Sequence, residues 1–268
     1  MNRKKNTRAI AALLCGALIA LVLLSGCSAS AEPVKAQGKS YFTYFDTVTY
    51  IYSYAGDSAE RFSDCSAEIA DTLGEYHRLF DIYHEYSGIN NLCTVNKMAG
   101  GDPVTVDARL MEFLLYAREL YTLTGGEMNV MMGSVLTLWH DARETASDDP
   151  KNPDAGFCAK LLLSDTSCVT SGIYERYFTV DGVRYHHIID RDTLYPSALF
   201  SSVTVVTKDS GLADALSTAL FCMPLADGEA LCESLGNVEA LWVLPDGEMH
   251  VTPGMEALLV SDEPAGDS

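Results

Sequence analysis

One stretch of the sequence, residues 209–221 (DSGLADALSTALF), constrains the fold most because it predicts a helix with a defined buried side. Asp209 and Ser210 both favour the N-cap position, where a side-chain oxygen accepts a backbone N–H. Behind them, apolar residues recur at the three- and four-residue spacing of one helix face. These residues are Leu212, Leu216, Ala219 and Leu220. The rest of the chain is expected to supply the core against which this face packs.

The same helix carries a candidate pair of oxygen ligands, Asp214 and Thr218. They are four residues apart, so on a helix the carboxylate and the hydroxyl lie one above the other. Such hard oxygens suit Mg²⁺, which keeps several waters and binds substrate phosphates. The alternative is a surface helix in which the threonine hydroxyl bonds back to its own backbone. The spacing alone leaves both interpretations open.

The N-terminus is predicted to be an export signal over residues 1–26. A positively charged start precedes an apolar run, Ile10 to Leu24, that is too short for a membrane span. The run ends in LSGC, which resembles a bacterial lipobox, in which Cys27 would be lipidated. This predicts an extracytoplasmic protein anchored to the cell membrane through its lipid; a cleaved signal with a coincidental cysteine is the alternative. Residues 27–39 are small and polar and predict a tether.

The chain is strongly acidic, with a formal net charge of −19, and removal of the basic signal makes it more so. An anionic surface repels phosphodiester backbones, so we expect no nucleic-acid partner. The cysteines after Cys27 have neither CxxC nor zinc-finger spacing. Several fall within apolar patterns, so we expect buried thiols rather than a zinc site or a disulfide framework.

The first part of the folded chain predicts strands, helices and loops without strict alternation. Residues 41–54 are rich in aromatic and β-branched side chains and predict a long strand. Asp57-Ser58 then begins a helix, residues 82–96 predict a loop, and Asp107 begins a second helix that ends at Gly125-Gly126. The apolar stripe of the first helix is Phe62, Cys65, Ile69, Leu73, Tyr76 and Phe80.

The second part contains a strong hairpin signal. Two strand-like runs, 175–180 and 183–189, are joined by Asp181-Gly182. Because side chains alternate along a strand, His186 and His187 are expected to point to opposite faces. One of them can face a site, and a purely structural role is the alternative. Further strands are predicted at 200–207, 240–244 and 248–251, a helix at 226–235 and a polar loop at 140–156.

These elements together predict an α+β fold, with a mixed or antiparallel sheet and packed helices. We expect a single domain over residues 40–260 and a disordered tail over 261–268. Four motifs in this order then suggest a family: GGEMNVMMGSVLTLW, VTSG followed by YERYF, HIID followed by Tyr195-Pro196, and GLADALSTALF. With FDTVTYI at residues 45–51 and the lipoprotein signal, they resemble the FAD:protein FMN transferases, the ApbE-type flavin transferases.

The resemblance implies an Mg²⁺-dependent enzyme that cleaves the pyrophosphate of FAD and transfers FMN to a Thr or Ser hydroxyl of a partner flavoprotein. By motif, Asp214 and Thr218 would ligate Mg²⁺, and His187 would be the general base for the incoming hydroxyl or its positioner. The residues that would contact FAD are Glu127, Met128 and Asn129. The chemistry is sensible, because Mg²⁺ neutralises developing phosphate charge and a histidine can take a hydroxyl proton near neutral pH.

The sequence also departs from the family's pattern. Between Trp139 and Ser171 the family carries LDxGxIAKGY-like and NxGGN-like stretches, which supply a backbone metal ligand and much of the flavin-binding wall. Their absence indicates an internally shortened chain, with a deletion near residues 157–161. Smaller departures are Asn129 for Asp, Arg191 for Pro and Leu194 for Gly. Three hypotheses follow: a flavin transferase, a non-catalytic flavin- or partner-binding lipoprotein, and an FAD pyrophosphatase with water as the acceptor.

Overall fold

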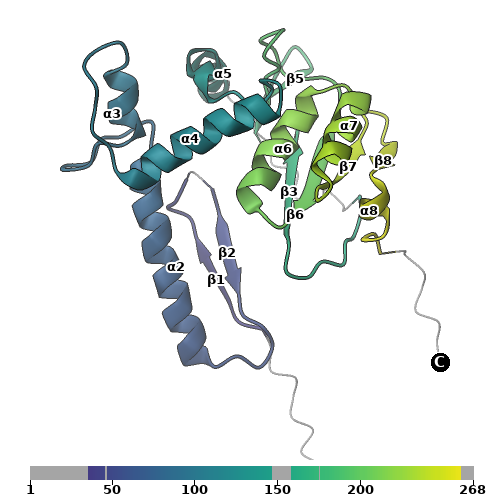
Figure 1. Ribbon diagram of the computed structural model, residues 1–268, viewed down its shortest axis with the longest axis horizontal. Helices are drawn as coiled ribbons and strands as arrows, with labels where there is room; N and C mark the ends of the chain where they lie inside the picture. The colour runs from purple at the N-terminus through teal and green to yellow at the C-terminus, as the bar shows by residue number, and fades with distance from the viewer. Residues whose placement is uncertain (1–35, 46, 147–157, 175, 261–268) are drawn as a thin grey trace, which may run out of the picture. The chain divides into compact units, whose positions relative to one another are not determined.

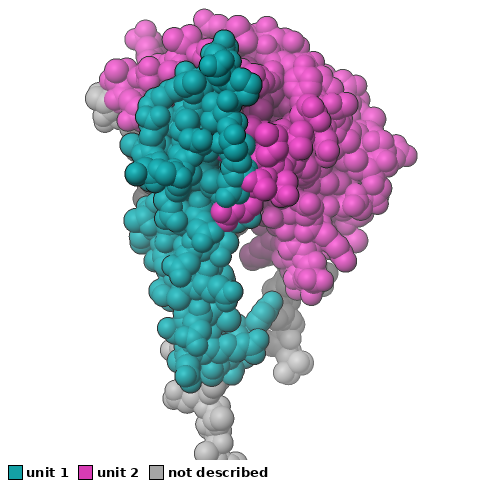
Figure 2. All heavy atoms as spheres, turned by 60° about the vertical axis from the view of Figure 1, so that its left-hand side comes forward, with its two compact units in different colours: residues 1–107 teal, residues 108–268 magenta. Residues whose placement is uncertain are grey.

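The computed structural model describes residues 36–45, 47–146, 158–174 and 176–260. The predicted signal at 1–26, the lipidated Cys27, most of the tether and the tail at 261–268 lie outside the described residues. Residues 1–107 and 108–268 form two compact units, teal and magenta in Figure 2, and each is described by itself. No helix among the described residues is long and apolar enough to cross a membrane.

The aromatic run at 41–54 forms part of a hairpin, so the prediction of one long strand is wrong. Strand β1 (Gly38–Tyr41) pairs antiparallel with β2 (Thr49–Tyr52). Between them the Thr47 N–H donates to the Tyr44 carbonyl at 3.2 Å, and the chain reverses. The β-forming composition is the same on both sides of this turn, so it does not reveal where the strand ends.

Helix α2 (Ala59–Phe80) begins as predicted, with the Ser58 side chain capping its first turn. Its inner face is wrongly predicted, because the larger apolar side chains are partly open and Ile69 is 41% exposed. Small residues allow the hairpin to approach instead, and Tyr41 Oη donates to the Ser66 carbonyl at 2.9 Å. The buried residues of α2 are Ser66, Ala70, Gly74 and Leu79.

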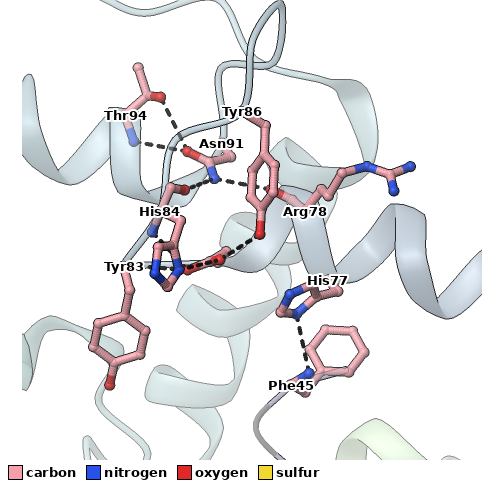
Figure 3. A network of polar contacts seen from close by, with 9 residues as sticks. Phe45, His77, Arg78, Tyr83, His84, Tyr86, Asn91 and Thr94 are labelled. Atoms are coloured by element: carbon pink, nitrogen blue, oxygen red, sulfur yellow. Dashed lines mark hydrogen bonds and ion pairs between the residues drawn. The ribbon is translucent and has the colours of Figure 1, made fainter. Parts of the chain in front are cut away.

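A short helix, α3 (Leu92–Lys97), lies at the end of the segment predicted as a loop, 82–96, so that prediction is wrong in its last residues. Asn91 is fully buried and caps α3 with its side-chain oxygen. Its amide nitrogen donates to the carbonyls of Arg78 at 3.0 Å and His84 at 2.8 Å (Figure 3). The Asn91 side chain therefore satisfies the backbone of a turn.

The second unit is built on a four-stranded antiparallel sheet in the order β3-β6-β7-β8. Helices α6 (Ser210–Cys222) and α7 (Leu225–Leu235) cover one face of this sheet (Figure 1). A second apolar cluster, which includes Met255 of α8 (Pro253–Glu256), lies on the other face. The strands are β3 (Ser167–Gly172), β6 (Ser202–Thr207), β7 (Glu239–Val243) and β8 (Met249–Val251). The predicted α+β fold with an antiparallel sheet is confirmed.

Local signals locate several elements of this unit well. From residue 200 onward, the predicted strands and helix agree with β6, α7, β7 and β8 to within two residues. Strands β4 (Tyr177–Val180) and β5 (Val183–His186) form the predicted hairpin. Its turn residues Asp181 and Gly182 have φ angles of 50° and 79°, the left-handed conformation that a tight two-residue hairpin requires.

Of the two helices that begin the second unit, one ends where the sequence predicts and the other extends into a predicted loop. Helix α4 (Ala108–Leu123) ends before Gly125-Gly126, as predicted, and both glycines have positive φ. A short 3₁₀ turn, η1 (Val130–Met132), then leads into α5 (Gly133–Thr145). Because α5 continues to residue 145, the prediction of a polar loop from residue 140 is wrong there. A half-exposed helix tolerates the same polar residues as a loop does.

The cysteines divide evenly between interior and surface. All six of the cysteines in the described part of the chain are free thiols, and no disulfide joins them. Cys93, Cys222 and Cys232 are buried, as predicted. The prediction is wrong for the exposed ones, Cys65, Cys158 and Cys168.

Candidate functional site

Helix α6 places Asp214 and Thr218 on its open stripe. The Asp209 side chain accepts a hydrogen bond from the Leu212 N–H at 2.9 Å and begins the helix as predicted. From Ala213 to Cys222, every residue is buried except Asp214, which is exposed, and Thr218, which is half-buried. The four-residue spacing therefore gives the shared face that it predicts, because the remaining faces of α6 are committed to the core.

A group of three hydroxyls connects this stripe to the neighbouring strand β3. Ser217 Oγ donates to the Asp214 carbonyl at 2.9 Å and lies 2.8 Å from Ser171 Oγ. Ser171 Oγ lies 3.4 Å from Thr218 Oγ1. Thr218 Oγ1 also lies 3.4 Å from the Asp214 carbonyl. This is the contact with the helix backbone that the alternative interpretation, a surface helix without a metal, predicts. Ser171 stands in the VTSG motif but has no predicted site role.

The Asp214 carboxylate is the exposed acidic group of this stripe. Among the described residues, none hydrogen-bonds to it, and desolvation raises its pKa above the ordinary range. A carboxylate that is partly desolvated and lacks a partner gains stability from a nearby cation. One carboxylate and one hydroxyl fit Mg²⁺, which completes its shell with waters and phosphate oxygens. In the described part of the chain, no cluster of three or more His, Cys, Asp or Glu side chains could enclose a metal ion.

Glu127 is held by Arg191, a residue with no predicted site role. Arg191 Nη2 lies 3.1 Å from Glu127 Oε1, and its Nη1 donates to the Gly125 carbonyl at 2.5 Å. Desolvation raises the pKa of Glu127, while the Arg191 charge opposes that rise. Glycine is favoured at position 126 by its φ of 96°, and a Cβ there would also lie 2.1 Å from Arg191 Nη1, so the guanidinium would have to shift. This ion pair joins positions 64 residues apart, so no local pattern could predict it.

The two residues after Glu127 have structural contacts of their own. The Met128 N–H donates to Thr124 Oγ1 at 3.0 Å, and its side chain packs against the core beneath α6. Asn129 Oδ1 accepts the Met131 N–H at 2.9 Å and caps η1. Both residues therefore shape the Gly-flanked segment.

The two histidines take opposite positions, as the strand alternation predicts. His186 is buried, and its Nε2 donates to the Ser197 carbonyl at 2.8 Å, which is a structural role. His187 is exposed, with its Nδ1 3.3 Å from the Arg176 carbonyl. Because a carbonyl only accepts, that nitrogen carries the proton and Nε2 offers a free lone pair. Desolvation, with repulsion from Arg176, His186 and Arg143, lowers the pKa of His187 to about 4, so the ring is neutral at pH 7.

The hydrogen bonds of the predicted site residues therefore form three groups within the second unit. Asp214 and Thr218 join Ser171, Glu127 joins Arg191, and His187 joins Arg176 in the hairpin. Helix α5 packs on the same hairpin, since Trp139 stacks on Tyr185 of β5 with ring centroids 5.7 Å apart. The chemistry available is a cation-binding oxygen pair, an acidic group with a positive partner, and a neutral imidazole that can accept a proton.

The fold and these groups define an α+β protein whose candidate site lies beside an antiparallel sheet covered by helices. The chain belongs to the ApbE family, whose model matches residues 43–162 and 146–242. Its relatives named FAD:protein FMN transferase include one from Treponema pallidum, 44% identical over 96 residues, and one from Rhodobacter capsulatus, 38% identical over 94 residues. Each match covers 35% of this chain, but only 26% and 18% of the relatives' own lengths.

Solved structures agree on the fold. The ApbE protein from Thermotoga maritima aligns with a TM-score of 0.70 and 21% identity, over 85% of this chain and 100% of its own. The flavin transferase ApbE from Vibrio cholerae aligns with a TM-score of 0.63 and 19% identity, over the same shares. At these identities the likeness shows the fold alone.

Proposed function

We propose that this protein cleaves FAD and transfers FMN to a Thr or Ser hydroxyl of a partner flavoprotein, with Mg²⁺ as the cofactor. The single observation that carries the proposal is the open stripe of α6, where the exposed Asp214 carboxylate, with a pKa raised by desolvation, and the half-buried Thr218 hydroxyl interrupt the buried run from Ala213 to Cys222. The relatives named FAD:protein FMN transferase support the same reaction.

In this reaction the acceptor oxygen forms a bond to the FMN phosphorus, and the bond from that phosphorus to the bridging oxygen breaks and releases AMP. Asp214 and Thr218 would hold Mg²⁺, which when bound neutralises charge on the pyrophosphate. His187 Nε2 accepts the proton of the incoming hydroxyl. Its low pKa keeps this nitrogen unprotonated at neutral pH, and its exposure lets the proton pass on to water. Alternatively, the same ring positions the hydroxyl.

The decisive experiment is in-gel flavin fluorescence. The full chain is incubated with FAD, Mg²⁺ and a carrier flavoprotein that bears the acceptor threonine. A fluorescent carrier band is expected, and it should disappear with EDTA or with a carrier whose acceptor threonine is changed to alanine. A non-fluorescent carrier, in the presence of a positive-control transferase that labels it, contradicts the proposal.

The non-catalytic binding protein is the second candidate function, and the absence of the LDxGxIAKGY-like and NxGGN-like stretches from the sequence favours it. The chain spans about a quarter or less of the length of the two relatives above, and the family's central flavin-binding motifs are absent from its sequence. Tight FAD binding without carrier labelling would identify this function. FMN and AMP formed without any carrier would identify the third candidate, an FAD pyrophosphatase.

The place of action is proposed to be the outer side of the cell membrane, with Cys27 as the lipid anchor. The support is the sequence alone, the charged and apolar signal followed by LSGC. Cys27→Ala should move the protein out of the membrane fraction and abolish its labelling by a palmitate analogue. Equal labelling of both forms would remove Cys27 from this role.

A further inference from the structure

We propose that Ser171 is a positioning residue that turns the Thr218 hydroxyl so that its oxygen faces a bound cation. The inference rests on the proposed function, because it deepens the same Mg²⁺ site. Ser171 lies on β3, the edge strand next to α6, and it comes from a position 47 residues away from Thr218 in sequence. Its role depends on which hydroxyl donates and which accepts in the hydrogen bonds among Ser171, Ser217 and Thr218.

That direction follows from counting protons. Each serine or threonine hydroxyl can donate once and can accept at its lone pairs. Ser217 gives its proton to the Asp214 carbonyl, which can only accept. In the 2.8 Å contact between the two serines, Ser171 must therefore be the donor. The Ser171 oxygen then has only acceptor sites left for Thr218, so Thr218 can donate to Ser171 and cannot accept from it.

This arrangement prepares Thr218 as a metal ligand. Among the described residues, two acceptors lie 3.4 Å from Thr218 Oγ1, namely Ser171 Oγ of β3 and the Asp214 carbonyl of the preceding helical turn. With its proton directed to one of them, the threonine keeps a lone pair for the open side. Coordination to a cation makes the Thr218 hydroxyl a stronger hydrogen-bond donor. An acceptor such as Ser171 Oγ therefore stabilises the cation-bound state. Groups behind a metal ligand typically change metal affinity by about 10- to 100-fold.

The strand offers a matched control beside Ser171. Thr170 is the preceding residue of β3, and its side chain points to the opposite face of the sheet. There its hydroxyl lies 2.8 Å from Thr204 Oγ1, a contact that does not involve α6. Removing either hydroxyl alters the same strand, but only the loss at Ser171 breaks the link to Thr218.

The test measures Mn²⁺ binding to the full chain with FAD present, by the loss of the free Mn²⁺ electron paramagnetic resonance signal. Ser171→Ala is expected to raise the Kd for Mn²⁺ about 10-fold, whereas Thr170→Val should change it less than about twofold. Ser171→Thr keeps the hydroxyl and should restore nearly the wild-type Kd. FAD affinity measured without metal should be the same in all of these variants.

The outcomes distinguish a failure of the role proposed for Ser171 from a failure of the proposed function. If the wild type binds Mn²⁺ and Ser171→Ala binds it equally well, Ser171 does not position Thr218, although the proposed function survives. If the wild type binds no Mn²⁺ with FAD present, both proposals are overturned. Should Ser171→Ala fail to fold, Ser171→Cys is used, since a thiol fills the site but accepts hydrogen bonds weakly; wild-type affinity in that variant also overturns the inference.

Discussion

Two aspartates in different units of this protein have opposite surroundings. Asp81, in the first unit, has a side chain only 4% exposed and accepts hydrogen bonds from the Tyr83 N–H at 2.7 Å, the His84 N–H at 3.0 Å and Tyr86 Oη at 2.8 Å. The three donor residues are labelled in Figure 3. Burial alone would raise its pKa, but these bonds overcome burial and lower the pKa to about 2. Asp214 has no such donors among the described residues, and desolvation raises its pKa.

The comparison teaches how to separate a structural carboxylate from a functional one. The negative charge of Asp81 is fully used inside the protein, because backbone and side-chain donors surround it. Asp214 is exposed and accepts no hydrogen bond from the described residues, so its negative charge is not used inside the protein. Such a group is the better candidate for a ligand of something outside the chain.

The largest effect that tests this comparison is expected at Asp214. Asp214→Ala should lower flavin transfer about 1000-fold or more, since metal-ion stabilisation of the reaction is worth several kcal/mol. It should also abolish the Mg²⁺-dependent change in FAD affinity, measured by titration. Asp227→Ala, at an exposed position in the neighbouring helix α7, is the control and should change neither quantity. An unchanged titration for Asp214→Ala would remove that residue from the site.

The converse prediction concerns the stability of Asp81. Asp81→Ala leaves several donors without their acceptor, so we expect a loss of about 3 kcal/mol in the free energy of unfolding. Urea unfolding measures this loss, with Asp71→Ala on the exposed side of α2 as the control. A loss below about 1 kcal/mol would mean that water replaces the carboxylate, and the contrast between the two aspartates would fail.

His187 tests whether the hairpin belongs to the same chemistry as α6. His187→Asn should reduce the transfer rate about 100-fold, the usual size of a general-base contribution, while FAD affinity stays within about twofold. Rate and affinity are measured on the same preparation. His186→Asn supplies the contrast, because its ring is buried and its loss should reduce stability instead. If rate and affinity fall equally in His187→Asn, the ring has a packing role.

The smallest expected effect is the loss of folding stability at acid pH, which also tests the contrast between the two aspartates. The folded pKa of Asp81, about 2, lies below its ordinary 3.8, so its stabilisation is complete above pH 4 and is lost as pH falls toward 2. The loss should be about 2 kcal/mol. His187 has a lowered pKa of about 4, so its smaller contribution, at an exposed ring, is lost between pH 6.5 and 4. When the free energy of unfolding is measured against pH, the decrease between pH 4 and 2 should be absent in Asp81→Asn. If that decrease is unchanged, it does not come from Asp81.

Local chemistry made much of the second unit predictable. The Asp209 cap, the glycine stop after α4 and the Asp181-Gly182 turn depend on side chains within a few residues, so they can be read without the rest of the chain. The predictions failed where the outcome depends on distant partners. The turn inside the aromatic run and the small-residue face of α2 are set by packing between hairpin and helix, which composition does not encode.

The sequence by itself determined that Asp214 and Thr218 share one helix face, because a four-residue spacing places them one turn apart wherever the helix lies. Only the tertiary structure decided that this face stays open, since the burial of the other faces depends on contacts with β3 and β6. It also brought Ser171 to Thr218 and Arg191 to Glu127, across 47 and 64 residues. Helical spacing is a local property, whereas the solvent and the partners of a side chain are properties of the whole packed unit.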